Sequence, residues 1–142
     1  MRFILLMFSI FFLISSTCNA EFRHIINLPK PNLPFSDGIV VGNTLYISGE
    51  DGIAANGKLV AGGIVPETNM AIAKIKKIIH VAGFRMRDVV QTTVYMTNIN
   101  DYPKMNTLYR HAFPKSFPTR ATIQVSNLVG DAHIEISAVA VK

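Results

Sequence analysis

The chain has 142 residues, with 14 basic and 9 acidic side chains, a formal net charge of +5 at pH 7 and one cysteine. This length accommodates one domain with its own hydrophobic core and excludes a multidomain enzyme. A single cysteine also excludes a framework of disulfides within the chain.

The first 20 residues have the features of a secretory signal sequence. Arg2 supplies a basic start, residues 3–14 are apolar except for Ser9, and small residues lead to a cleavage position after Ala20. The apolar run would span about 18 Å as a helix, too short for the roughly 30 Å of bilayer hydrocarbon. An uncleaved anchor is the alternative, whereas the residues before Cys18 form a poor lipidation signal.

We therefore predict a signal peptide over residues 1–20, a single domain over residues 21–142, and an exported protein, periplasmic or secreted, with no stable membrane anchor after cleavage. Because Arg2 and Cys18 would be removed, the mature chain would have 122 residues, a net charge of +4 and no cysteine. N-terminal sequencing of the mature product should find its first residue at or near Glu21. A cytoplasmic protein that keeps Met1 would contradict this.

A mature chain without cysteine has no thiolate nucleophile and no cysteine-based metal site. The four histidines show no metal-binding spacing, such as two of them one helical turn apart beside a glutamate. We therefore expect no metal site.

The first half of the mature chain is expected to form short strands followed by one helix. Gly42-Asn43 separates two β-branched runs and is typical of a two-residue hairpin turn. Between residues 66 and 82 apolar side chains repeat at helical spacing, with a proline in the first turn and a glycine after the end. Three lysines lie away from this apolar stripe and are expected to be solvated: Lys74, Lys76 and Lys77. The expected elements are strands Phe22–Ile26, Ile39–Val41 and Thr44–Ser48, a candidate short strand Lys58–Val60, and helix Pro66–Ala82.

The second half is expected to continue with strand, helix and two further strands. The last two strands are expected to be joined by a turn near Gly130-Asp131. The order of elements predicts an α+β domain with both helices on one face of a sheet. Its expected elements are strand Asp88–Thr97, helix Asp101–Phe113, and strands Arg120–Asn127 and Ala132–Val141.

Polar side chains share one face of each of the last two strands. A sheet with one face in water would explain this pattern. The sharper hypothesis is a pocket containing Arg120 and Glu135, since a guanidinium binds carboxylates bidentately and a glutamate accepts a proton or orients a water. If a tight turn near Gly130 pairs these strands, the two residues lie roughly 20 Å apart. One small molecule could then touch both only across a subunit boundary.

Two C-terminal segments resemble the signature of a known family. Residues 117–125, Phe-Pro-Thr-Arg-Ala-Thr-Ile-Gln-Val, and residues 134–140, Ile-Glu-Ile-Ser-Ala-Val-Ala, are similar to the C-terminal signature of the RidA (YjgF) family. The resemblance runs from about Pro34 to Lys142. Further matches are Pro34-Phe35-Ser36, Leu45-Tyr46-Ile47-Ser48-Gly49, Thr92-Thr93-Val94-Tyr95-Met96 and Asn106.

The resemblance implies a chorismate-mutase-like sheet with two helices on one face, assembled as a homotrimer with clefts between subunits. It implies hydrolysis of 2-imino acids, such as 2-iminopropanoate and 2-iminobutanoate, to 2-oxo acids and ammonia with no cofactor. Carried onto matching positions, Arg120 would hold the substrate carboxylate and Glu135 would orient the attacking water.

The same resemblance implies a set of binding residues around these two. Ser48 and Gly49 would line the cleft, with Asn106 beside it, and the backbone near Thr122 would contact the imine nitrogen or the water. Two positions depart from the family pattern: Phe35 stands where the family often has tyrosine, and Thr122 stands where it often has cysteine. These departures leave the arginine and glutamate in place and bear on the range of substrates.

Competing interpretations remain open at this point. A non-catalytic exported trimer could bind small carboxylates or protein partners in the same cleft. Some members of the family have been described as ribonucleases, but a charge of +4 without a stripe of basic and aromatic residues is a poor nucleic-acid footprint, so we expect no nucleic-acid partner. Tyr95, Tyr102 and Tyr109 are expected to be packing or interface residues.

Overall fold

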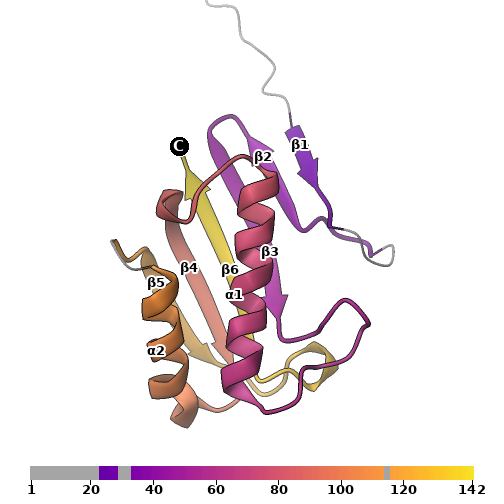
Figure 1. Ribbon diagram of the computed structural model, residues 1–142, viewed down its shortest axis with the longest axis vertical. Helices are drawn as coiled ribbons and strands as arrows, with labels where there is room; N and C mark the ends of the chain where they lie inside the picture. Colours follow the sequence, from indigo (N-terminus) through magenta and orange to yellow (C-terminus); the bar gives the residue numbers. More distant parts are fainter. Residues whose placement is uncertain (1–22, 29–32, 114–115) are drawn as a thin grey trace, which may run out of the picture.

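One sheet with two helices on one of its faces forms the described part of the chain (Figure 1). The computed structural model describes residues 23–28, 33–113 and 116–142, so the predicted signal sequence lies outside it. The elements are β1 (Arg23–Ile26), β2 (Gly38–Val41), β3 (Thr44–Asp51), α1 (Ile64–Val81), β4 (Val89–Met96), α2 (Tyr102–Ala112), β5 (Thr119–Gln124) and β6 (Ile134–Val141). The predicted α+β class and the placement of both helices on one face are confirmed.

The order of strands in the sheet is β1-β2-β3-β6-β4-β5. The predicted hairpin of the last two strands is therefore wrong: β6 lies between β3 and β4 and is antiparallel to both, while β5 pairs with β4 in parallel. The physical reason is the helix α2 between β4 and β5, because a helical crossover returns the chain in the same direction as it left. The turn near Gly130 exists, but it leads β6 into the centre of the sheet.

Helix α1 supplies most of the helical side of the core. Its buried aliphatic side chains, including Ile75, Ile78 and Ile79, pack over β3 and β6 as the apolar stripe predicted. The helix ends before Gly83, whose φ of 75° lies in the left-handed region favoured by glycine. The short strand expected near residue 59 is reduced to a single bridge between Ile53 and Leu59.

A buried carboxylate ties the start of α1 to the start of β6. Glu67, in the first turn of α1, is 0% exposed. Its Oε2 accepts a hydrogen bond of 2.7 Å from the backbone N–H of His133, and its Oε1 lies 2.6 Å from Nδ1 of the same residue. A Cβ added to Gly52 would collide with Glu67, so glycine is needed there for the carboxylate to fit.

We expect Glu67→Ala to lower the free energy of unfolding by about 3 kcal/mol, because truncation leaves a cavity at a fully buried position and removes the acceptor of the His133 N–H group. Glu67→Gln keeps one acceptor oxygen and should lose less. Urea denaturation followed by circular dichroism measures both. A Glu67→Ala protein as stable as the wild type would contradict this role of the buried carboxylate.

The face of the sheet opposite the helices is open and partly apolar. Along β6 the residues alternate between buried side chains under the helices and less buried ones on this helix-free face, among them Glu135. Tyr46 on β3 is 53% exposed and Ile123 on β5 is 44% exposed. A polar side facing water, one of the two interpretations that the sequence left open, does not describe β5: Arg120 and Thr122 lie on the α2 side, and the apolar residues of β5 face outward.

Candidate active site

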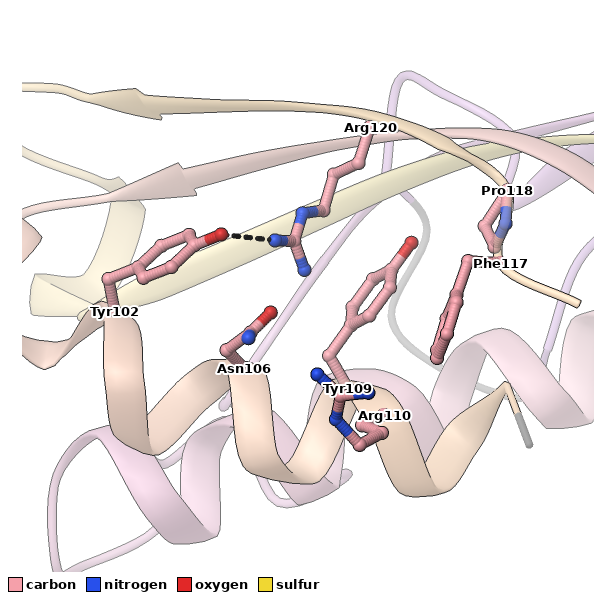
Figure 2. A pocket seen from close by; sticks show the side chains of 7 residues that line it. All are labelled: Tyr102, Asn106, Tyr109, Arg110, Phe117, Pro118 and Arg120. Carbon is pink, nitrogen blue, oxygen red and sulfur yellow. Dashed lines mark hydrogen bonds between the residues drawn. The ribbon is translucent and has the colours of Figure 1, made fainter.

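A pocket of about 310 Å³ lies between α2 and the beginning of β5. Figure 2 shows Arg120 reaching from the strand toward the helix, into the space between two tyrosines, while Phe117 stands at the far end of the pocket. The lining contains two arginines and an amide but no carboxylate. The residues that line it are Tyr102, Asn106, Tyr109, Arg110, Phe117, Pro118 and Arg120.

Two tyrosines of α2 hold the guanidinium of Arg120. Its Nη2 donates a hydrogen bond of 2.7 Å to the hydroxyl of Tyr102, and its Cζ lies 4.5 Å from the ring centre of Tyr109. Among the described residues, no ion pair joins Arg120 to an aspartate or glutamate. The guanidinium is therefore oriented by neutral groups, and its other N–H groups can bind an anion.

Tyr109 forms the buried wall of this pocket. Its hydroxyl shares a 2.7 Å hydrogen bond with the Thr92 hydroxyl of β4, and its ring packs against Phe113 at 4.7 Å. Burial raises the pKa of Tyr109, outweighing the lowering by the bond to Thr92 and by the charge of Arg120. The phenol is thus neutral and fixed, and it serves as a rigid support for Arg120.

The sequence predicts packing or interface roles for Tyr102 and Tyr109 and no role for Arg110. Tyr109 is indeed a core residue at 3% exposure. All three nevertheless line the pocket together with Asn106. The spacing of residues 102, 106, 109 and 110 places them along one side of a helix, and this signal could have identified them.

Glu135 belongs to a second cluster, on β6 and β3. It is the register partner of Asp51 on β3 and of Tyr95 on β4. A Cβ on Gly49 would overlap the Glu135 side chain, so the absence of a side chain at residue 49 makes room for this carboxylate. The resemblance implies that Gly49 lines the cleft and that Glu135 orients the water, and these roles stay predictions.

Burial raises the pKa of Glu135, and the neighbouring carboxylate of Asp51 raises it further, while the ammonium of Lys74 lowers it. Lys74 was expected to lie on a solvated helix face, and this is wrong. Its Nζ lies 2.7 Å from Oδ1 of Asp51 and 3.6 Å from Oε2 of Glu50, because α1 packs directly over β3. Lys76 and Lys77 are exposed as expected.

We expect Lys74→Met to move the acidic limb of the pH–activity profile to higher pH. If Glu135 acts as an anion, activity appears as the pH rises through its pKa, and removing the nearby cation raises that pKa. Lys74→Arg should restore the wild-type profile. Lys76→Met, an exposed change on the same helix, is the matched control, and an unshifted limb in Lys74→Met would contradict the coupling.

The other residues that the resemblance brings into the candidate site are Ser48, Phe35 and Thr122. The hydroxyl of Ser48 donates to the backbone carbonyls of Ser36 at 2.9 Å and of Asp37 at 3.1 Å, so it holds the segment before β2 beside β3. Phe35, in that segment, is 52% exposed. Thr122 follows Arg120 on the same side of β5, opposite Val94 in register.

A single chain does not bring Arg120 and Glu135 together. Arg120 pairs with Thr92, which pairs with Ala138, three residues from Glu135. Two strand spacings and three residues along a strand separate their Cα atoms by about 14 Å. Their side chains also lie on opposite faces of the sheet, so one small molecule reaches both only if two chains contribute.

The described residues contain neither a candidate metal site nor a membrane-spanning helix. No group of three or more histidine, cysteine, aspartate or glutamate side chains there could hold a metal ion. No helix in the same part of the chain is long and apolar enough to cross a bilayer.

The described residues form an α+β sheet protein whose pocket holds the guanidinium of Arg120 and is lined by no carboxylate. Residues 25–142 match the family model described as Endoribonuclease L-PSP, and the chain belongs to this family, which confirms the resemblance to RidA (YjgF) proteins. The chain is 41% identical over 124 residues to the goat 2-iminobutanoate/2-iminopropanoate deaminase, covering 84% of this chain and 90% of that protein.

Other relatives agree with this assignment. A RutC family protein of Pyrococcus horikoshii is 41% identical over 117 residues, which cover 82% of this chain and 93% of the relative. The crystal structure of YyfA from Yersinia pestis, described as a protein of unknown function in the conserved Rid family, superposes with a TM-score of 0.80 at 32% identity. That comparison covers 85% of this chain and 100% of the other.

Proposed function

We propose that this protein hydrolyses 2-imino acids, such as 2-iminopropanoate and 2-iminobutanoate, to 2-oxo acids and ammonia. The observation that carries the proposal is the guanidinium of Arg120, oriented by Tyr102 and Tyr109 in a pocket lined by no carboxylate. A 2-imino acid presents a carboxylate to such a group. The identity of about 40% to named 2-iminobutanoate/2-iminopropanoate deaminases supports the same substrate class.

In the proposed reaction, Arg120 binds the carboxylate and so fixes the position of the adjacent imine carbon. Glu135 accepts a hydrogen bond from a water and takes one proton from it as the water oxygen adds to that carbon. The imine nitrogen takes up a proton as the C–O bond forms. The C–N bond of the resulting carbinolamine then breaks, and ammonia leaves as the hydroxyl proton is lost to form the 2-oxo acid. Asn106 lines the same pocket as Arg120 and is placed to contact the substrate.

The proposed active sites lie between the subunits of a homotrimer. Arg120 and Glu135 of one chain lie on opposite faces of the sheet, so a complete site needs Glu135 from a neighbouring copy. The helix-free face, with exposed Tyr46 and Ile123, is the surface on which such copies would pack. Export of the mature protein belongs to the same proposal, so its imines would be those released outside the cytoplasm.

The test is a coupled assay in which an amino-acid oxidase generates the imine in the presence of the mature protein, beside light scattering to measure the size. We expect faster release of the 2-oxo acid than in buffer alone, from a trimer. A stable monomer at micromolar concentration would overturn the interfacial site. A trimer that binds 2-oxo acids without accelerating hydrolysis would favour the non-catalytic alternative, and cleavage of an RNA substrate would favour a ribonuclease.

A further inference from the structure

A second guanidinium lines the Arg120 pocket. Arg110 follows Tyr109 on α2, is exposed, and lines the same cavity as Arg120. Its Cζ lies 5.5 Å from the ring centre of Phe117, which keeps the side chain beside the pocket. Figure 2 shows Arg110 and Phe117 close together, at the end of the pocket away from Tyr102.

No carboxylate of residues 23–28, 33–113 or 116–142 forms an ion pair with either guanidinium. Among the described residues the cations paired with carboxylates are Lys74, Arg87, Lys104 and His133, and the lining of the pocket holds no aspartate or glutamate. Two arginines in a cavity of about 310 Å³ without a carboxylate give a strongly positive site. A substrate with one carboxylate satisfies only one of them.

We propose that Arg110 is a second carboxylate-binding group and that the site prefers 2-imino dicarboxylates, the imines of acidic amino acids, over 2-imino monocarboxylates. This inference rests on the proposed imine hydrolysis and names its substrate class. Arg120 binds the carboxylate next to the imine carbon, and Arg110 binds the carboxylate at the other end of the chain. The reaction is unchanged: water and the 2-imino dicarboxylate give the 2-oxo dicarboxylate and ammonia.

The exposure of Arg110 determines how strong the preference for dicarboxylates is expected to be. Because Arg110 is exposed, solvent screens its interaction with the second carboxylate, and we expect a modest effect. The value of kcat/KM should be about tenfold higher for 2-iminosuccinate than for 2-iminobutanoate, which has the same number of carbons but one carboxylate. The preference should weaken at high salt, since it depends on a screened charge.

Two measurements on the full mature protein test this. The first compares kcat/KM for 2-iminosuccinate and 2-iminobutanoate, generated by suitable amino-acid oxidases. The second compares, by calorimetry without turnover, the affinities for 2-oxoglutarate and 2-oxopentanoate. We expect Arg110→Gln to reduce both dicarboxylate-to-monocarboxylate ratios about tenfold, and Arg110→Lys to keep part of them. Arg87→Gln removes an exposed arginine outside the pocket and should leave both ratios unchanged.

The outcomes separate this inference from the proposed function. Hydrolysis of both imines at equal efficiency, or a preference unaffected by Arg110→Gln, overturns the role of Arg110 while imine hydrolysis stands. Tighter binding of 2-oxoglutarate that depends on Arg110, without turnover of either imine, overturns the proposed hydrolysis while the two-carboxylate site stands. If Arg87→Gln lowers the two ratios as much as Arg110→Gln does, the preference reflects the overall charge of the protein, and the inference is overturned.

Discussion

Arg120→Ala should reduce kcat/KM for 2-imino acids by about 100-fold or more while leaving the protein folded. The substrate carboxylate loses a charge-assisted bidentate partner, and such a pair contributes about 3 kcal/mol in a partly enclosed site. Fixing the carboxylate also positions the imine carbon, so both KM and kcat should suffer. The measurement is the rate of 2-oxo acid release, with circular dichroism and light scattering on the same sample.

Two further variants define what Arg120 contributes. Arg120→Lys keeps the charge but loses the planar fork, so it should recover only part of the activity. Tyr102→Phe removes the hydroxyl that accepts the 2.7 Å hydrogen bond from Nη2 and should raise KM by a smaller factor, since the ring of Tyr109 still supports the guanidinium. A folded Arg120→Ala trimer with full activity would remove the basis of the proposed site.

The helices and most strands could be predicted because their signals are local. The apolar stripe of α1, its start near Pro66 and its end at Gly83 follow from spacing and backbone preference alone. The hairpin at Gly42-Asn43 follows from the turn residues, and β2 and β3 pair across it as predicted. Such elements need no knowledge of what packs against them.

Strand pairing over a distance was not predictable in the same way. The alternation of side chains in β5 predicts which residues share a face of the strand. It does not predict which strand pairs with β5, nor which of its faces the helices cover. The deciding feature is the position of α2 between β4 and β5, which makes their pairing parallel and places Arg120 under the helix. The side chain of Lys74 illustrates the same limit, because its ion pair with Asp51 joins residues 23 apart in the sequence.

The candidate site could be predicted in part. Arg120 and Asn106 line one pocket, and Gly49 lies against Glu135. The roles that the resemblance implies for these four residues stay predictions. Arg110 lies in none of the segments that carry the resemblance, and only the packing of α2 beside the start of β5 brings it into one pocket with Arg120. The separation of Arg120 from Glu135 was overestimated at roughly 20 Å from the wrong hairpin, yet the corrected pairing still keeps them about 14 Å apart.

Glu135→Gln should reduce kcat by about 100-fold to 1,000-fold with little change in KM, the range typical of losing a general base. The amide is nearly the same size and keeps one acceptor oxygen, so the fold and carboxylate binding by Arg120 should persist. It cannot take a proton from the attacking water. Single-turnover measurements of 2-oxo acid release, beside calorimetric binding of 2-oxobutanoate, separate the chemical step from binding.

Gly49→Ala tests the position of the same carboxylate without changing its charge. A methyl group at residue 49 would overlap the Glu135 side chain and force it to another rotamer, at little cost to stability because a flexible side chain can move. We therefore expect a loss of kcat approaching that of Glu135→Gln, in a protein whose melting temperature is almost unchanged. The double variant Gly49→Ala with Glu135→Gln should be no slower than Glu135→Gln alone, because both changes disable the same carboxylate. Additive losses would mean that Gly49 acts through something other than Glu135.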